Sequence, residues 1–223
     1  MAGIYGNAEK AALLREGAIL SVPRIRTETI EAIARKILME YDRTLLEGEP
    51  RAIPIETIIE TQFNLTLEYH ILRKNACILG ETIFDDGAVI LYDQYNHEYR
   101  LIAVTAGTIL IDERLCEPNM IGRLRFTCGH ELAHWVLHQN LYTGTGDVAA
   151  YDGKSSSDES NGIIERQADL LASALLMPLP QIKKCFYRLR PKYSMEQLIV
   201  EMAKIFEVSK QAMKIRLQSH NLI

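Results

Sequence analysis

Cysteine is scarce in this chain, and its spacing excludes two common structural devices. The 223 residues contain four cysteines, and no two of them form a C-x-x-C pair: Cys77, Cys116, Cys128 and Cys185. A disulfide framework and a zinc knuckle both require closer and more regular cysteine spacing. We therefore expect reduced thiols and a cytoplasmic protein.

Long apolar runs and a surplus of positive charge are also missing. No apolar stretch approaches the roughly 18 residues that a membrane span needs, so we expect no membrane partner. The first residues include Glu9, Lys10, Arg15 and Glu16 and lack the continuous apolar run of a secretory signal. The net charge of −4 argues against bulk nucleic-acid binding.

The charge is nevertheless unevenly distributed. Residues 181–223 hold nine Lys or Arg against three Glu, or +6, which leaves −10 for the rest of the chain. A basic tail of this kind can contact DNA, but it is more often a solvated face or a docking surface for an acidic partner. We expect no direct DNA binding.

A His-Glu-x-x-His pattern lies at residues 130–134, within the segment RFTCGHELAHWVLH. On a helix each residue turns by about 100°, so His130 and His134 lie one turn apart on the same face. Two imidazoles placed in this way can bind one small cation at about 2.0–2.1 Å. Glu131 lies beside them and can accept a proton from a water on the metal. The pattern predicts a zinc hydrolase site.

The residues around this pattern favour a helix. Leu124, Cys128, Leu132 and Trp135 recur at spacings of three and four, which would bury one face of a helix against a core. Two core or surface histidines on an ordinary helix are the alternative interpretation.

A third ligand decides the class of zinc site. The pattern in which a third His follows an intervening Gly would need Gly at 137 and His at 140, where the chain has Leu137 and Asn140. Further along, residues 163–176 form a strongly helical segment that stops before a proline. Within it Glu165 and Asp169 are four residues apart, so both carboxylates point the same way.

These two carboxylates have different expected roles. Glu165 can complete a His₂Glu zinc site and leave the fourth position to water. Asp169 can accept the second ring N–H of a ligand histidine and hold its tautomer. A solvated polar edge is the alternative for both, but the His-Glu-x-x-His pattern about thirty residues upstream favours ligation.

Several motifs together resemble the ImmA/IrrE family of metallopeptidases. They are Arg125-Phe126-Thr127 before the His-Glu-x-x-His pattern, Trp135-Val136-Leu137-His138 after it, Glu165-x-x-Ala168-Asp169, and Leu175-Leu176-Met177-Pro178. The resemblance runs from about Pro54 to Leu217. Residues 139–162 form a longer link than the family suggests, and residues 1–50 have no clear counterpart in it.

The resemblance implies gluzincin-type ligation of one Zn²⁺ per chain. By position, the family's ligands fall on His130, His134 and Glu165, and its general base falls on Glu131. It also implies intracellular proteolysis of a helix-turn-helix repressor, often beside mobile elements or stress genes. Transcription regulation and stress response are the corresponding roles.

The remainder of the chain predicts an α+β fold. Helical patterns cover residues 27–41, 54–63, 181–190, 194–206 and 209–217. Strand patterns cover residues 65–71, 76–84, 88–92, 99–105 and 108–111, with a hairpin turn at Asp85-Asp86-Gly87. We expect a mostly antiparallel sheet of four or five strands packed on the zinc helix, with flanking N- and C-terminal helices. The edge of such a sheet can hold an extended peptide.

Two further expectations concern organisation. The chain divides into an N-terminal helical extension, residues 1–50, and a metallopeptidase domain, residues 51–223, that ends in the basic tail. Residues 142–162 are rich in Gly, Ser and Asp and predict a loop, either an active-site lid or a link without function. Residues 143–161 should be the most mobile internal segment.

The leading hypothesis is a zinc endopeptidase with Glu131 as its general base. The rival is a non-proteolytic, zinc-containing regulator that binds a repressor or DNA, which the basic tail weakly favours and the intact Glu131 opposes. A closed structural zinc site would need a fourth protein ligand, and no cysteine lies where such a ligand is expected. His138 could line the cleft, but three residues rising about 12 Å along one helix cannot converge on one ion.

Overall fold

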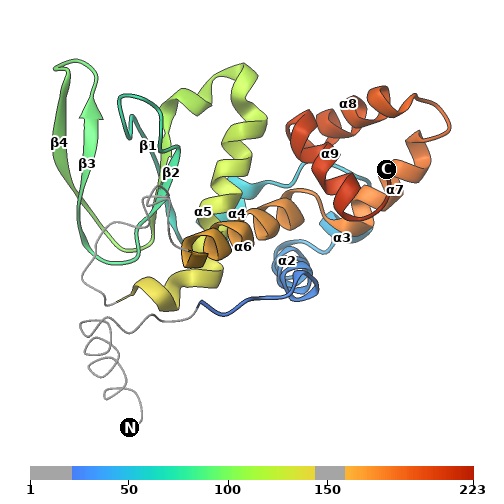
Figure 1. The fold of residues 1–223 in the computed structure, drawn as a ribbon, viewed down its shortest axis with the longest axis horizontal. Helices are drawn as coiled ribbons and strands as arrows, with labels where there is room; N and C mark the ends of the chain where they lie inside the picture. The colour runs from blue at the N-terminus through green and yellow to red at the C-terminus, as the bar shows by residue number, and fades with distance from the viewer. Residues whose placement is uncertain (1–21, 144–158) are drawn as a thin grey trace, which may run out of the picture.

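The computed structural model describes residues 22–143 and 159–223. Figure 1 shows a long helix, α5 (Ile121–Tyr142), with strands on one side and the C-terminal helices on the other. Helix α6 (Glu159–Leu176) crosses the lower part of α5 in this view, and α2 (Thr27–Tyr41) lies below α6. The mixture of helices and small sheets confirms the predicted α+β class.

The helices predicted near the two ends of the chain are present to within a few residues: α2, α4 (Ile55–Thr61), α7 (Leu179–Leu189), α8 (Met195–Phe206) and α9 (Lys210–Ser219). Three short helices were not predicted: α3 (Thr44–Glu47), η1 (Glu113–Cys116) and η2 (Pro118–Met120). A capping box starts α8, since the Ser194 side chain accepts from the Gln197 N–H and the Gln197 side chain accepts from the Ser194 N–H. Among the described helices, none combines the length and the apolar character that crossing a membrane requires.

The loop predicted over residues 142–162 is wrong at both ends. Tyr142 is the last residue of α5, and Glu159–Gly162 form the first turn of α6. At the end of α5, Tyr142 stacks on Phe84 with ring centroids 5.0 Å apart, and this contact favours the longer helix. The rest of the predicted loop, residues 144–158, and with it the expected lid and mobility, lies outside the described residues.

The strands form two sheets, where a single sheet was expected. In the first, β5 (Thr108–Asp112) lies between β1 (Thr66–His70), which is parallel to it, and β2 (Gly80–Thr82), which is antiparallel. The second is the antiparallel pair β3 (Gly87–Asp93) and β4 (Glu98–Val104). Every residue of β5 is buried, as is typical of a strand covered on both faces.

The predicted hairpin across residues 85–87 is wrong, because β2 and β3 belong to different sheets. Asp86 accepts a hydrogen bond from the backbone N–H of Ala106 (2.8 Å), and the Gly107 N–H donates to the Ile83 carbonyl (2.9 Å). These contacts fasten the turn to the segment before β5 and keep β3 from folding back on β2. Gly107 has φ 85°, a left-handed conformation that glycine tolerates.

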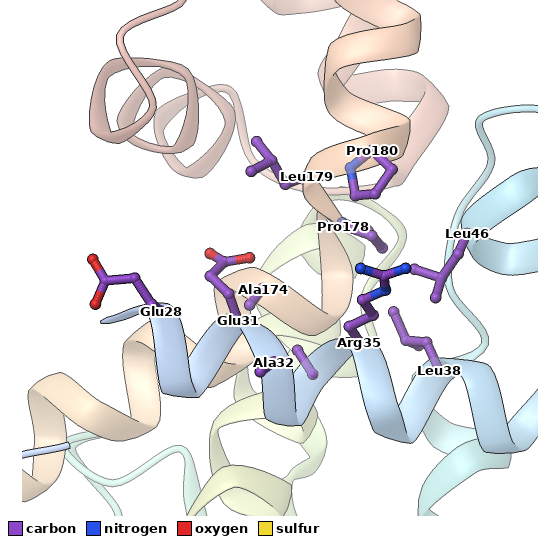
Figure 2. A pocket seen from close by; sticks show the side chains of 11 residues that line it. Glu28, Glu31, Ala32, Arg35, Leu38, Leu46, Ala174, Pro178, Leu179 and Pro180 are labelled. Carbon is purple, nitrogen blue, oxygen red and sulfur yellow. The ribbon is translucent and has the colours of Figure 1, made fainter. Parts of the chain in front are cut away.

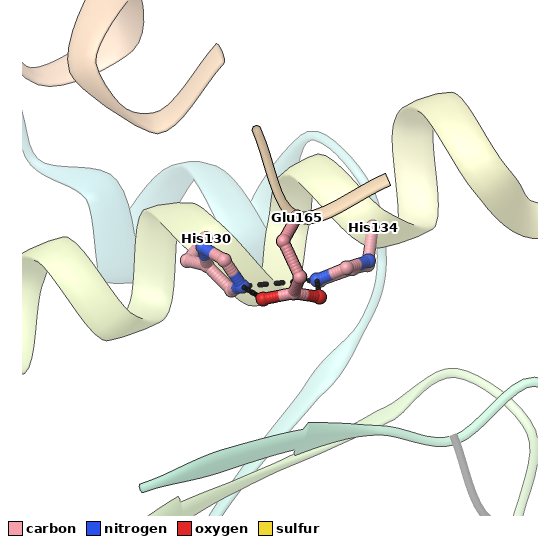
Figure 3. A group of neighbouring side chains, drawn as sticks. All are labelled: His130, His134 and Glu165. Atoms are coloured by element: carbon pink, nitrogen blue, oxygen red, sulfur yellow. Dashed lines mark hydrogen bonds and ion pairs between the residues drawn. The ribbon is translucent and has the colours of Figure 1, made fainter. Parts of the chain in front are cut away.

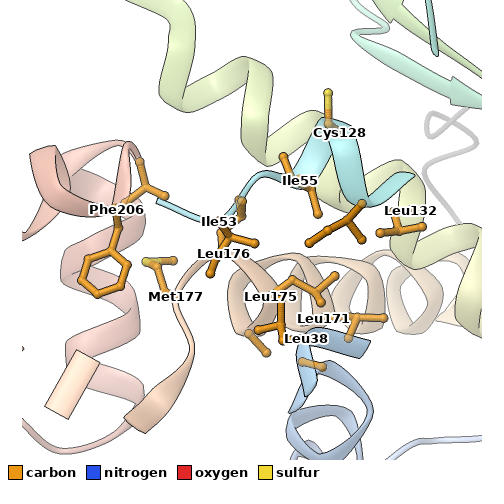
Figure 4. Close-up of a cluster of buried hydrophobic side chains, with 14 of the residues drawn as sticks. Leu38, Ile53, Ile55, Cys128, Leu132, Leu171, Leu175, Leu176, Met177 and Phe206 are labelled. Atoms are coloured by element: carbon orange, nitrogen blue, oxygen red, sulfur yellow. The ribbon is translucent and has the colours of Figure 1, made fainter. Parts of the chain in front are cut away.

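One apolar core joins α2, α5 and α6 to the C-terminal helices (Figure 4). Its fully buried members include Leu38, Leu132, Leu171, Leu175 and Phe206. Gly129 of α5 faces Ala172 of α6, and a Cβ at position 129 would lie 3.5 Å from the Ala172 Cβ. Two small residues thus let the helices approach closely. The division of the chain near residue 50 stays a prediction, although α2 shares this core in space.

Two surface hollows have linings that include no residue of the predicted zinc site. One, of about 300 Å³, lies between α2 and the start of α7, with Glu28, Glu31 and Arg35 among mostly apolar neighbours (Figure 2). The other, of about 700 Å³, lies beside β3 and β4 and includes His70 and His97. Within the described ranges, neither holds a cluster of three metal-ligating groups.

Truncation of a core leucine tests this assignment. Leu175→Ala should lower the free energy of unfolding by about 2–5 kcal/mol, because a fully buried leucine leaves a cavity when it is shortened. Leu101→Ala is the matched control: Leu101 is 70% exposed on β4 and should change stability by about 0.5 kcal/mol or less. Urea denaturation measures both values. Equal losses would contradict the assigned core.

Candidate metal centre

Helix α5 presents His130 and His134 on one face, and α6 places Glu165 opposite them (Figure 3). The Nε2 atoms of the two imidazoles are 2.9 Å apart. Glu165 Oε2 lies 3.3 Å from His130 Nε2, and Glu165 Oε1 lies 3.2 Å from His134 Nε2. One donor atom from each residue lies within 4.8 Å of the other two. The structure therefore brings the three predicted ligands together.

The hydrogen bonds around this cluster fit a bound cation. Asp169 Oδ1 lies 3.0 Å from His130 Nδ1, and because a carboxylate only accepts, that nitrogen carries the proton. The other ring nitrogen, Nε2, faces His134 and Glu165, where it can carry a proton or offer its lone pair to a cation. Glu165 Oε1 is buried and faces His134 Nε2 at 3.2 Å. Such donors gather favourably around a positive charge, and two imidazoles with one carboxylate suit zinc.

Hydrogen bonds within the cluster also shift the pKa values of His130 and Glu165. Burial alone would lower the pKa of His130, but hydrogen bonds to Asp169 and Glu165 raise this pKa to about 10. Burial would raise the pKa of Glu165, but hydrogen bonds to His130 and His134 lower it to about 2. The cluster thus favours a positive charge held against an ionised carboxylate.

Glu131 is held in place by β2 of the first sheet. Its side chain is buried, and the Thr82 hydroxyl on β2 lies 2.7 Å from its Oε2 and 3.0 Å from its backbone oxygen. A Cβ at Gly80 would lie 2.5 Å from Glu131 Oε1, so only glycine leaves room for the carboxylate there. Thr82 and Gly80 were not predicted as site residues. A short strand far from the His-Glu-x-x-His pattern gives no local signal of this contact.

His138 lies behind His134, inside the protein. It is 1% exposed, its Nδ1 lies 3.2 Å from His134 Nδ1, and its Nε2 lies 3.1 Å from Gln167 Oε1. Burial lowers the pKa of His138 to about 4. Gln167, in turn, donates to the carbonyl of Pro23 (2.8 Å). The sequence suggested His138 as a cleft residue and gave no role to Gln167, which follows Glu165 by two positions on α6.

Comparison with protein families agrees with this geometry. The model of the M78 peptidases, described as the IrrE N-terminal-like domain, matches residues 86–218. The chain belongs to this family, and the resemblance drawn from the sequence is confirmed. The match contains both α5 and α6, and begins later than Pro54, where the resemblance was placed. Among curated proteins, no match is found.

Family membership sets the general class of the protein. It defines a metallopeptidase-like domain, from a family that is zinc-dependent in general. A peptidase family implies a protein substrate. The three clustered side chains are a possible metal site of the kind that such a family requires.

The contact between Thr82 and Glu131 can be tested through stability. Thr82→Val should lower the free energy of unfolding by about 1–3 kcal/mol, because it removes the hydroxyl donor from a buried carboxylate. Thr82→Ser keeps the donor and should retain most of that stability. Chemical denaturation of Thr82→Val, Glu131→Gln and the double variant should give a coupling of about 0.5–3 kcal/mol. Strictly additive losses would show that the two groups do not interact.

Proposed function

We propose that this protein is a zinc-dependent endopeptidase in which His130, His134 and Glu165 are the ligands and Glu131 is the general base. The observation that carries the proposal is the convergence of these ligands beside a buried carboxylate that is not part of their cluster. Membership of a metallopeptidase-like family supports it.

The ligand residues have distinct tasks in this proposal. His130 and His134 present nitrogen donors from one helix, and Glu165 supplies an anionic oxygen from a second helix. Asp169 orients His130 through its contact with Nδ1. When bound, zinc supplies Lewis acidity, which polarises a carbonyl and acidifies water.

Glu131 carries out the proton transfers. Its carboxylate accepts a proton from the water that attacks the scissile carbonyl, and it returns the proton to the leaving amine as the C–N bond breaks. Thr82 fixes one of its oxygens, so the carboxylate has a defined direction before substrate arrives. Burial keeps bulk water from competing for the same oxygen atoms.

The substrate in this proposal is a specific intracellular protein, a helix-turn-helix repressor. Its support is the sequence resemblance to ImmA/IrrE proteins together with the family match. A role in transcription regulation, in stress response or beside a mobile element belongs to the same proposal. The four cysteines all lie in the described part of the chain and are free thiols, which supports a cytoplasmic location.

Metal content tests the ligand assignment. The purified protein should hold about one zinc, which His134→Ala should abolish and Glu165→Ala should weaken. Asp169→Asn should bind zinc roughly ten- to a hundredfold more weakly, because it loses only an orienting contact. His70→Ala, a histidine outside the cluster, is the control and should bind as the wild type does.

Thermal unfolding provides an independent reading of the same site. Zinc at about 100 times its dissociation constant should stabilise the wild type by roughly 2.7 kcal/mol. His134→Ala should show no such gain. Wild-type protein without metal and without zinc stabilisation would refute the ligand assignment.

Replacement of the base separates catalysis from binding. Glu131→Gln keeps the volume and hydrogen bonding of the side chain but cannot accept a proton, so it should keep zinc and lose cleavage by a factor of about 10²–10⁴. The assay follows the length of a candidate repressor, one encoded next to this gene, in the presence of the wild type or of Glu131→Gln. If the wild type and Glu131→Gln relieve repression equally and the repressor stays intact, the protein is a binding regulator and not a peptidase.

A further inference from the structure

A buried chain of polar contacts leads from the candidate metal centre to the N-terminal segment. His134 Nδ1 lies 3.2 Å from His138 Nδ1, and His138 Nε2 lies 3.1 Å from Gln167 Oε1. Gln167 Nε2 donates to the Pro23 carbonyl at 2.8 Å. The three side chains are 4%, 1% and 4% exposed, so water has little access to these contacts.

The Pro23 carbonyl, at the far end of these contacts, determines which group donates in each of the hydrogen bonds. A backbone carbonyl can only accept, so the amide nitrogen of Gln167 must face Pro23. The amide oxygen of Gln167 must then face His138, and this oxygen can only accept as well. The proton in that contact therefore belongs to His138 Nε2.

The same reasoning fixes which ring nitrogen carries the proton, first in His138 and then in His134. A neutral imidazole carries one N–H, and charge on a side chain this buried, between an amide and a second imidazole, is unfavourable. With its proton on Nε2, His138 presents an accepting Nδ1. His134 must therefore donate from Nδ1, which leaves the lone pair on Nε2. That is the nitrogen that faces Glu165 and His130.

We propose that His138 and Gln167 are positioning residues that fix the tautomer and ring orientation of His134, with the Pro23 carbonyl as their anchor. The proposal rests on the proposed function only in taking His134 as a zinc ligand. It assigns a site role to a segment that lies before residues 86–218, the range of the family match. His130 is oriented separately, by the exposed Asp169.

Zinc affinity of the full chain tests this role, with a chromophoric chelator as competitor. His138→Leu removes both polar contacts and should weaken zinc binding by about 10- to 100-fold. Gln167→Leu removes the contacts with His138 and Pro23 but leaves the contact between His138 and His134. It should weaken zinc binding by about tenfold, at the lower end of the same range. His138→Gln can still accept from His134 and donate to Gln167, so it should restore most of the affinity.

Gln181→Leu is the matched control for these variants. Gln181 is also a buried glutamine (2% exposed) that donates to a backbone carbonyl, that of Gly48, but it lies on α7 outside the chain of contacts. Gln167→Leu and Gln181→Leu should lose similar stability in metal-free protein. Only Gln167→Leu should lose zinc affinity.

The tautomers can be read directly from imidazole ¹H–¹⁵N spectra of the zinc-loaded wild type. His138 should show a protonated Nε2 and an unprotonated Nδ1, and His134 a protonated Nδ1. A His138 proton on Nδ1, or zinc binding by His138→Leu and Gln167→Leu as tight as by Gln181→Leu, would overturn the proposal. Wild-type protein that binds zinc without cleaving any repressor would instead count against the peptidase function alone.

Discussion

The close packing of α5 on α6 is the constraint on which the candidate metal centre depends. Two histidines come from one helix and the carboxylate from the other, so their geometry is only as well defined as the contact between the helices. Gly129 and Ala172 allow that contact to be close, and the buried leucines on either side hold it. The polar cluster is thus positioned by the apolar core, and a cation shared by its donors would balance the charge of the Glu165 carboxylate.

Much of this centre could be predicted from sequence, because it is local on each helix. The spacing of His130 and His134 places both on one face, and the helical pattern around Glu165 makes it available as a third ligand. Thr82, Gly80 and Gln167 could not be predicted in the same way. Thr82 lies 49 positions from Glu131, and Gln167 lies 144 positions from Pro23, so no periodicity connects the partners.

The sheet shows the same limit at the level of the fold. Alternating patterns correctly indicated strands, but they do not say which strands pair. β5 is apolar through its middle residues and buried throughout, which is the pattern of a central strand and places β1 and β2 on either side of it. The turn at Asp86 resembled a hairpin by composition alone, while its hydrogen bond reaches across to Ala106.

The contact made by Pro23 has a consequence for how relatives of this protein should be compared. The group that accepts from Gln167 is a backbone carbonyl, which every amino acid possesses. Residue 23 can therefore change freely without loss of the acceptor, provided that the path of the chain is kept. An alignment scored by residue type would record this position as variable, and the part that the main chain plays beside the metal centre would leave no trace in it.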